Sequence, residues 1–370
     1  RALAKPIAEL TVTYGSHSYG QVHADLGKRF GAEQRLGVRF NGVYGTGKMG
    51  AKDEKQTRSV GALGIDYLGD RARFSLDVYN SINKISNGSP GMFNFTGNAA
   101  IPGVGVLLSP PRGDTNRFRG THGKYDNTGV LARGEFDFNE NWQGYVAFGA
   151  GVAKGRGLMF GTRAIVTGLD GATRGAIYNV DTRSKRQTAE AGVIGKFSTG
   201  AVKHRAQLSA NILKMKEGTN NTACNYCYNT NMYDPVTPVF PNPPVWNGYD
   251  KATVRSNNDF RSLAIADTMS FANDAVLLTL GGRYQSIKQP WNNYSKSRFS
   301  PMLAAVVRPW GDSVALFGNY TEGMEPGQVV GVTYANAGDV LGPRVSKQME
   351  LGVKFQTGEL THTVSAFQIK

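Results

Sequence analysis

The sequence predicts an all-β protein whose antiparallel strands form a membrane-spanning barrel. Three observations support this prediction: strands with one apolar and one polar face recur, the connections between them alternate in length, and no apolar run approaches the roughly 18 residues of a membrane helix. The 370 residues include 47 glycines, 16 tyrosines and 18 phenylalanines, and mean hydropathy is -0.34. Aromatic residues favour strands and glycines favour tight turns, so the composition agrees with an all-β chain.

The stretch RARFSLDVY, residues 71–79, shows the two-faced pattern. Its apolar members are Ala72, Phe74, Leu76 and Val78, and its polar members are Arg71, Arg73, Ser75 and Asp77. Successive side chains of a strand point to opposite faces, so this segment has one apolar and one polar face. A soluble sandwich covers the apolar face with a second sheet, whereas a membrane barrel exposes it to lipid and lines a wet lumen with the other face.

The same pattern recurs in order at residues 22–27, 36–41, 130–137, 205–212 and 349–356. Charges repeat steadily on the second face while the first stays apolar, which favours the membrane barrel over the sandwich. The residues expected to face lipid include Leu76, Leu208 and Leu351, and those expected to face the lumen include Asp77, Gln207 and Glu350.

The connections sort by length. Fifteen strands are predicted from about Ala8 onward, with tight turns at 30–34, 68–71, 139–142, 198–202, 271–274, 309–313 and 357–360. Between them lie longer polar segments, rich in Gly and Pro, at 46–57, 84–127, 154–186, 216–258, 288–296 and 324–344. Short turns on one rim and long loops on the other are typical of outer-membrane barrels, whose turns lie in the periplasm.

This alternation makes a topological prediction. The turns at Gly69, Asn139 and Gly358 are expected on one rim, and the loops that contain Tyr125, Cys224 and Trp291 on the other. An odd strand number conflicts with the even number of bacterial single-chain barrels. The chain is therefore expected to be a piece of a larger protein, unless the strand count is wrong by one.

The charge balance limits the partners. Lysine and arginine outnumber acidic residues 42 to 28, which gives a net charge of +14 and suits nucleic acid, anionic lipid headgroups or an anionic ligand. No nucleic-acid-binding motif and no basic helix occurs in the sequence, so nucleic acid is not expected as a partner. No signal peptide opens the chain at Arg1, which fits a missing N-terminal part as well as a cytoplasmic origin.

Enzyme motifs are not found in the sequence. The five histidines, His17, His23, His122, His204 and His362, are scattered, and no Gly-x-Ser-x-Gly, HExxH or phosphate-loop motif occurs. An enzyme is therefore not expected, although Ser, His and Asp on neighbouring strands of a barrel hydrolase would leave no local motif.

The cysteine pair in ACNYCYN lies in a predicted outer loop. Cys224 and Cys227 have the spacing of a redox couple or of half a zinc site. Zinc needs a second pair of Cys or His nearby, and none follows. A local disulfide in an oxidising space is the favoured interpretation, ahead of metal binding.

Residues 297–330, SRFSPMLAAVVRPWGDSVALFGNYTEGMEPGQVV, and 334–370, YANAGDVLGPRVSKQMELGVKFQTGELTHTVSAFQIK, resemble the barrel of TonB-dependent ferric-siderophore receptors. The matching motifs are a Ser-Pro (Ser300, Pro301), an Arg-Pro at a turn (Arg308, Pro309), a Tyr-x-Glu-Gly-x-x-Pro-Gly run (Tyr320, Glu322, Gly323, Pro326, Gly327) and a SKQxExGVK strand (346–354). LTLGGRYQ (278–285) and RGEFDFNENWQGYVAFGAG (133–151) are also similar to strands of this family.

The resemblance implies a monomeric receptor in the outer membrane of a Gram-negative bacterium that imports a ferric siderophore with energy from TonB. Such barrels have about 22 strands and a plugged lumen. Residues 8–370 would then be a partial barrel domain, without the N-terminal plug, its TonB box and about seven last strands, and would not transport alone. Implied partners are the ferric siderophore, the TonB complex through the plug, and outer-membrane lipid and lipopolysaccharide. No cofactor is implied, because the iron arrives as a chelate.

In this family aromatic side chains surround the metal complex, and basic or polar groups pair with its oxygens. The ligand-binding candidates in the long loops are Arg117, Arg119, Tyr125, Tyr226, Tyr228, Trp246, Tyr249, Trp291 and Tyr294. Aromatic residues near a rim also form interfacial girdles, and loop arginines also bind lipopolysaccharide phosphate or are merely solvated, so these alternatives stay open.

Two alternative functions also remain. A passive porin has fewer strands, about 16 to 18, and an acidic constriction loop in an open lumen. Haem, cobalamin or nickel-chelate receptors share the TonB-dependent architecture, and the sequence does not specify the ligand. A plug-sized domain upstream of Arg1 would indicate the receptor, and a bare signal peptide would indicate the porin.

Overall fold

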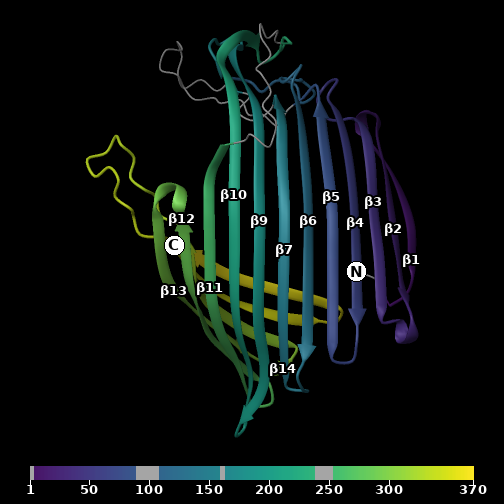
Figure 1. Cartoon of the computed structure of the whole chain (residues 1–370), viewed down its shortest axis with the longest axis vertical. Helices are drawn as coiled ribbons and strands as arrows, with labels where there is room; N and C mark the ends of the chain where they lie inside the picture. Colours follow the sequence, from purple (N-terminus) through teal and green to yellow (C-terminus); the bar gives the residue numbers. More distant parts are fainter. Residues whose placement is uncertain (1–3, 89–107, 159–162, 238–252) are drawn as a thin grey trace.

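The structure is a computed structural model that describes residues 4–88, 108–158, 163–237 and 253–370 (Figure 1). Its strands are β1 (Ile7–Gly15), β2 (Tyr19–Phe30), β3 (Leu36–Lys48), β4 (Lys55–Leu68), β5 (Ala72–Ser86), β6 (His122–Asp137), β7 (Trp142–Leu158), β8 (Arg163–Val166), β9 (Ala172–Thr199), β10 (Val202–Asn231), β11 (Thr253–Phe271), β12 (Val276–Gln289), β13 (Tyr294–Val307), β14 (Pro309–Asp312), β15 (Val314–Glu325), β16 (Arg344–Thr357) and β17 (Leu360–Ile369). Single 3-10 turns are η1 (Ser16–Ser18), η2 (Ala32–Gln34) and η4 (Pro290–Asn292).

All the strands except β14 form one sheet, in which spatial order follows chain order. The path runs from β1 to β7, then β9 to β13, then β15 to β17, and β8 pairs with β9 beside it. Neighbours along the path are antiparallel. Fifteen strands on this path confirm the predicted number and order for the part of the chain that the structure describes.

All seven predicted tight turns are confirmed. Because the path is antiparallel throughout, the turns at Gly69, Asn139 and Gly358 fall on one rim, and the long connections fall on the other. Figure 1 shows the turns between β4 and β5 and between β6 and β7 at the lower end of the sheet. Gly200 and Gly358 have φ angles of 59° and 60°, and such positive values favour glycine at these turns.

The upper strand ends were predicted too short. The predicted loop 216–258 is wrong in extent, since β10 continues to Asn231 and β11 begins at Thr253. Tyr125 and Cys224 likewise lie in strands, not in loops. Above a lipid layer both faces of a strand meet water, so the hydropathy alternation stops while backbone pairing continues. Figure 1 shows β9 and β10 rising above their neighbours.

The two faces of the sheet differ as predicted. The apolar face carries exposed Phe74, Leu208 and Leu351, of which Leu351 is 71% exposed. Leu208 lies opposite Ile265, so neighbouring strands continue the same apolar surface. The polar face carries arginines, carboxylates and amides. No helix among the described residues is long and apolar enough to cross a membrane.

The sheet of this chain is open. β1 pairs with β2 and β17 pairs with β16, and these two outermost strands do not pair with each other. Figure 1 shows the sheet curving, with β16 and β17 crossing behind the earlier strands.

Candidate functional site

The described part of the connection between β5 and β6, residues 108–121, is held by the buried side chain of Asn116. Asn116 is 2% exposed, and its amide donates hydrogen bonds to the backbone oxygens of Lys52 at 2.8 Å and Asn87 at 2.7 Å. Its side-chain oxygen accepts a bond from the Phe118 nitrogen at 3.0 Å. The predicted ligand residues Arg117 and Arg119 therefore extend from a braced loop, joined to the neighbouring β3–β4 loop.

Two acidic residues of the β3–β4 loop have opposite pKa shifts. Lys48 forms an ion pair with Asp53 at 3.0 Å and lowers its pKa, with smaller contributions from Lys52 and Arg119. Burial instead raises the pKa of Glu54. The Glu54 carboxylate lies close to Gly88, where a Cβ atom would be 2.4 Å from it, so a larger residue at position 88 would displace the Glu54 side chain. This loop therefore carries one acid that is paired with a lysine, Asp53, and one whose charge is disfavoured by burial, Glu54.

Tyr125 lies on the polar face near the upper end of β6. It is opposite Asn83 of β5 and Gly155 of β7. Gln56 donates to the Asn83 side chain at 2.9 Å, so the upper polar wall here consists of amides beside a phenol. Such groups suit a polar, oxygen-rich ligand at the mouth.

The tall β9–β10 hairpin is linked to the loop of Arg117 and Arg119. The Tyr233 hydroxyl donates to the Ser109 backbone oxygen at 2.9 Å. Tyr228, a predicted ligand residue, packs against Gly175, where a Cβ atom would lie 2.0 Å from its ring. The structure therefore connects two predicted loop groups through Tyr233, a residue that sequence reasoning missed because the contact joins positions 124 residues apart.

Trp291 and Tyr294 have different surroundings. Trp291 is 54% exposed and donates from Nε1 to the Asn258 side chain at 3.3 Å, so its ring face is available at the rim. Tyr294 is 1% exposed, and its hydroxyl accepts a hydrogen bond from the Gly327 nitrogen at 2.9 Å. Tyr294 therefore braces the loop between β15 and β16, and its burial argues against direct contact with a ligand.

The remaining predicted residues are covered only in part. Trp246 and Tyr249 lie outside the described residues. Cys224, Tyr226 and Cys227 lie on β10, with Cys224 opposite Ile177 and a register shift before Tyr228, while their side chains lie outside the described part. The disulfide between Cys224 and Cys227 stays a prediction.

The Tyr-x-Glu-Gly motif forms an ion-paired cluster. The Glu322 side chain is 6% exposed and accepts from Arg298 at 2.8 Å, with Lys347 at 3.9 Å. The Tyr320 hydroxyl donates to the same carboxylate. Gly327 ends the motif where a Cβ atom would lie 2.2 Å from the Gly342 oxygen. These contacts hold β15 against β13 and β16. The charged and hydroxyl side chains of the motif therefore have a structural role in the sheet.

The polar face is a continuous network rather than an apolar core. Arg133 binds Glu135 at 2.7 Å and its guanidinium lies 4.4 Å from the centre of the Tyr145 ring. The Tyr145 hydroxyl donates to Glu190 at 2.8 Å. Such a wall suits a wet lumen or a polar domain packed inside it.

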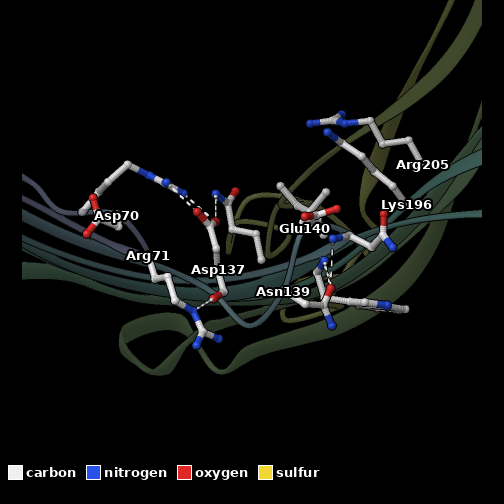
Figure 2. Close-up of a pocket in the computed structure, with 12 residues that line it drawn as sticks. Asp70, Arg71, Asp137, Asn139, Glu140, Lys196 and Arg205 are labelled. Atoms are coloured by element: carbon white, nitrogen blue, oxygen red, sulfur yellow. Dashed lines mark hydrogen bonds and ion pairs between the residues drawn. The ribbon is translucent and has the colours of Figure 1, made fainter.

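A pocket of about 610 Å³ lies on this wall at the short-turn rim (Figure 2). Arg73 and Gln143 hold Asp137 at 2.6 and 3.0 Å. Lys196 and Arg205 lie opposite each other on β9 and β10, and Figure 2 shows their side chains running alongside each other. Neither side chain has an ion pair or hydrogen bond with the described residues. Sequence reasoning missed this pocket, although both cations have polar-face positions beside a predicted turn.

The fold defines the class as outer-membrane β-barrel proteins. The features that do so are the short turns on one rim, the tall strands on the other, the apolar outer face and the ion-paired inner face. Within that class the chain belongs to the family described as TonB dependent receptor-like, beta-barrel, whose model matches residues 66–370. Members of this family are outer-membrane transport receptors of Gram-negative bacteria. The recognised motifs, at 297–330 and 334–370, lie inside the matched region.

Individual relatives agree with this assignment. The chain is 29% identical over 386 residues to the ferrichrome receptor FcuA of Yersinia enterocolitica, covering 100% of this chain and 49% of that protein. It is similar to the crystal structure of BauA, the ferric preacinetobactin receptor from Acinetobacter baumannii, with 29% identity, a TM-score of 0.84, and coverage of 100% and 55%. The closed form of Fiu, the ferric-catecholate import receptor of E. coli K12, has a TM-score of 0.78 at 16% identity, over 100% and 58%, which shows the fold alone. The chain spans about half the length of the curated relative that it matches.

Proposed function

We propose that this barrel belongs to an outer-membrane receptor that captures a ferric siderophore and imports it with energy supplied through TonB. The observation that carries the proposal is the agreement of two relatives at 29% identity over the whole chain, one named a ferrichrome receptor and one a ferric preacinetobactin receptor. The family match favours this function over the passive porin.

The upper rim supports capture of a chelate. Arg117 and Arg119 extend from a braced loop, Tyr125 lies on the adjoining wall, and Trp291 presents an exposed ring. Cations pair with the oxygens of an anionic chelate, and aromatic faces cover its apolar parts. A rim fixed by Asn116 and Tyr233 loses little conformational entropy on binding.

Further partners belong to the same proposal. Residues 8–370 form part of the barrel domain, and a plug domain elsewhere in the protein fills the lumen and contacts TonB. The polar network of the inner face suits such a plug. The receptor acts as a monomer in the outer membrane, in contact with lipid and lipopolysaccharide.

Growth tests address the function directly. A strain that lacks the complete gene is supplied with hydroxamate, catecholate or mixed ferric siderophores, or with haem, as the sole iron source. We expect loss of growth on one siderophore class, restoration by the complete gene, and no restoration in a strain without TonB. Unchanged growth on every siderophore, or uptake that persists without TonB, contradicts the proposal.

A further inference from the structure

Two neighbouring turns line one side of the pocket of about 610 Å³ at the short-turn rim (Figure 2). In the turn between β6 and β7, the Asn139 side chain accepts hydrogen bonds from the Asn141 nitrogen at 2.9 Å and the Trp142 nitrogen at 3.0 Å. In the turn between β4 and β5, Arg71 donates from Nε to the Asp137 backbone oxygen at 3.0 Å. These bonds hold the turns together, so this side of the pocket is fixed before a ligand binds.

Some charged groups of the pocket already have partners. Arg73 contacts the two carboxylate oxygens of Asp137 at 2.6 and 2.7 Å, and Gln143 donates to the same carboxylate at 3.0 Å. Asp70 forms an ion pair with Arg35 at 2.8 Å. These groups build the wall, and their charges are neutralised within the protein.

Two cations and one acid of the pocket differ from these groups. Lys196 of β9 lies directly opposite Arg205 of β10. Figure 2 shows the two side chains extending in the same direction, with their charged ends on the same side. Among the described residues, neither cation forms an ion pair, and neither does Glu140, which lines the same pocket. Like charges directly across a strand pair destabilise a sheet, so an anion held by both cations would relieve this repulsion.

Both cations point to the inner face of the sheet. Phe197, the residue after Lys196, is 44% exposed on the apolar face, and successive side chains of a strand alternate between faces. Arg205 shares its face with Gln207, whose side chain bonds the Tyr145 hydroxyl of the polar inner network at 3.4 Å. The pocket therefore opens on the inner side of the short-turn rim and does not face lipid.

The free charges of the pocket specify the chemistry of a ligand. Lys196 and Arg205 attract an anion, and a guanidinium group pairs with a carboxylate through two parallel hydrogen bonds. Glu140 repels a ligand that is only anionic and attracts an ammonium group. The amide side chains of Asn139 and Asn141 also line the pocket and match the hydrogen-bonding groups of a peptide backbone. A pocket of this volume suits a small ligand.

We propose that this pocket binds a short acidic peptide, with carboxylates on Lys196 and Arg205 and an ammonium group on Glu140. This inference rests on the proposed outer-membrane location, because the short-turn rim then faces the periplasm. Free peptides and the stem peptides of cell-wall murein both offer this chemistry in that compartment. Charge complementarity selects a peptide with more carboxylates than ammonium groups over a purely anionic solute.

The upper part of the same hairpin provides a matched control. Lys185 of β9 and Lys216 of β10 are also exposed, directly opposed cations, and neither forms an ion pair with the described residues. They lie on the other face of the sheet, toward the long-loop rim. Replacing both with glutamine changes the charge of the hairpin by the same amount without touching the pocket.

The test uses the complete receptor in a non-ionic detergent and isothermal titration calorimetry. The probe is the murein tripeptide L-alanyl-γ-D-glutamyl-meso-diaminopimelate, which the wild type should bind saturably. K196Q/R205Q should bind it about a hundredfold more weakly, because each lost charge-assisted hydrogen bond is worth about tenfold. K185Q/K216Q should bind like wild type.

Glu140 is tested through the ammonium group of the probe. E140Q should bind the tripeptide about tenfold more weakly than wild type. Acetylation of the amino groups of the probe should abolish this difference between E140Q and wild type. A loss of affinity in E140Q that persists with the acetylated probe contradicts the assigned role of Glu140.

A sedimentation assay with intact murein sacculi separates the two sources of the peptide. Sedimentation of the wild type but not of K196Q/R205Q supports the site and assigns its ligand to the cell wall. Binding of the tripeptide without sedimentation supports the site and assigns its ligand to free peptides.

Three results overturn the proposal. The first is no binding of the tripeptide to the wild type, which with a lower Tm in K196Q/R205Q would assign both cations to a contact within the receptor. The second is unchanged affinity in K196Q/R205Q. The third is equal competition by inorganic phosphate, which would leave a site for an adventitious ion only.

Ferric-siderophore binding by the same variants separates the peptide site from the proposed function. K196Q/R205Q should bind the siderophore like wild type, because the pocket and the long loops lie at opposite rims. A receptor that binds the tripeptide but no siderophore refutes the proposed function and leaves the peptide site standing.

Discussion

The Tyr294 hydroxyl of β13 accepts a 2.9 Å hydrogen bond from the Gly327 nitrogen, 33 residues further along the chain. Both residues are buried. The bond fixes the start of the segment 326–343, which forms its own internal hydrogen bonds, including Val330 nitrogen to Asp339 oxygen at 2.9 Å. A predicted ligand residue is thus part of the support of a rim loop.

Tyr294→Phe should loosen this loop without altering the strands. It leaves the buried Gly327 nitrogen without an acceptor, which costs about 1 to 3 kcal/mol. Hydrogen exchange at the Gly327 amide should accelerate about tenfold or more. Tyr334→Phe is the control, because Tyr334 lies in the same loop and is 67% exposed. Equal exchange rates in the two variants would show that the hydroxyl does not brace the loop.

The fold was largely predictable because lipid and water impose a strict alternation on each strand. The segment from Arg71 to Val78 shows this alternation of apolar and polar residues. The positions of the tight turns could be predicted where the alternation is interrupted. The upper strand ends were not predictable in this way, because Tyr125 and Cys224 lie where both faces of a strand meet polar surroundings. Backbone pairing holds these segments, and pairing leaves no pattern in hydropathy.

The candidate site was predictable only by residue type and region. Trp291 is exposed at the rim as its sequence position indicated, whereas Tyr294, three residues later, is buried by a distant loop. The Tyr233 contact with Ser109 similarly depends on tertiary structure. Aromatic composition identifies candidates, but loop packing decides which of them a ligand can reach.

Arginine at Leu208 should destabilise the folded barrel in a bilayer. Leu208 lies on the apolar face, and a charge there costs about 2 to 4 kcal/mol near the midplane of a membrane. Gln207→Lys is the matched control, because Gln207 is the adjacent residue on the polar face and makes only a 3.4 Å bond to Tyr145. Urea unfolding in lipid vesicles measures both variants. Equal losses of stability would contradict the assignment of the two faces.

Glu54 and Asp53 should give the β3–β4 loop opposite pH responses. The folded-state pKa of Glu54 is raised by burial, so its contribution favours the loop at low pH and is lost as pH rises through that pKa. The pKa of Asp53 is lowered by Lys48, so its contribution is present above its usual value of 3.8 and is lost as pH falls through the folded-state pKa.

Glu54→Gln should therefore slow hydrogen exchange of the loop at neutral pH and remove the gain in loop stability at low pH. Asp53→Asn should instead speed hydrogen exchange of the loop at neutral pH. Hydrogen exchange at the Met49 amide, which donates to the Glu54 backbone oxygen at 3.1 Å, measures both effects between pH 3 and 7 after correction for intrinsic exchange. Shifts of the same sign in the two variants would refute the assignment of burial to Glu54 and of the ion pair to Asp53.

Trp291→Ala should weaken ferric-siderophore binding by the complete receptor about tenfold, which is about 1.4 kcal/mol. Its ring is exposed at the long-loop rim and is oriented by the bond to Asn258, so little entropy is lost when a chelate packs against it. Trp310→Ala is the control, since Trp310 is 69% exposed but lies on β14 at the short-turn rim. Quenching of intrinsic fluorescence on titration with the chelate gives both affinities. A Trp291 variant that binds like wild type, or a Trp310 variant that loses affinity equally, would mean that the chelate is held elsewhere, with Arg117 and Arg119 the next residues to replace.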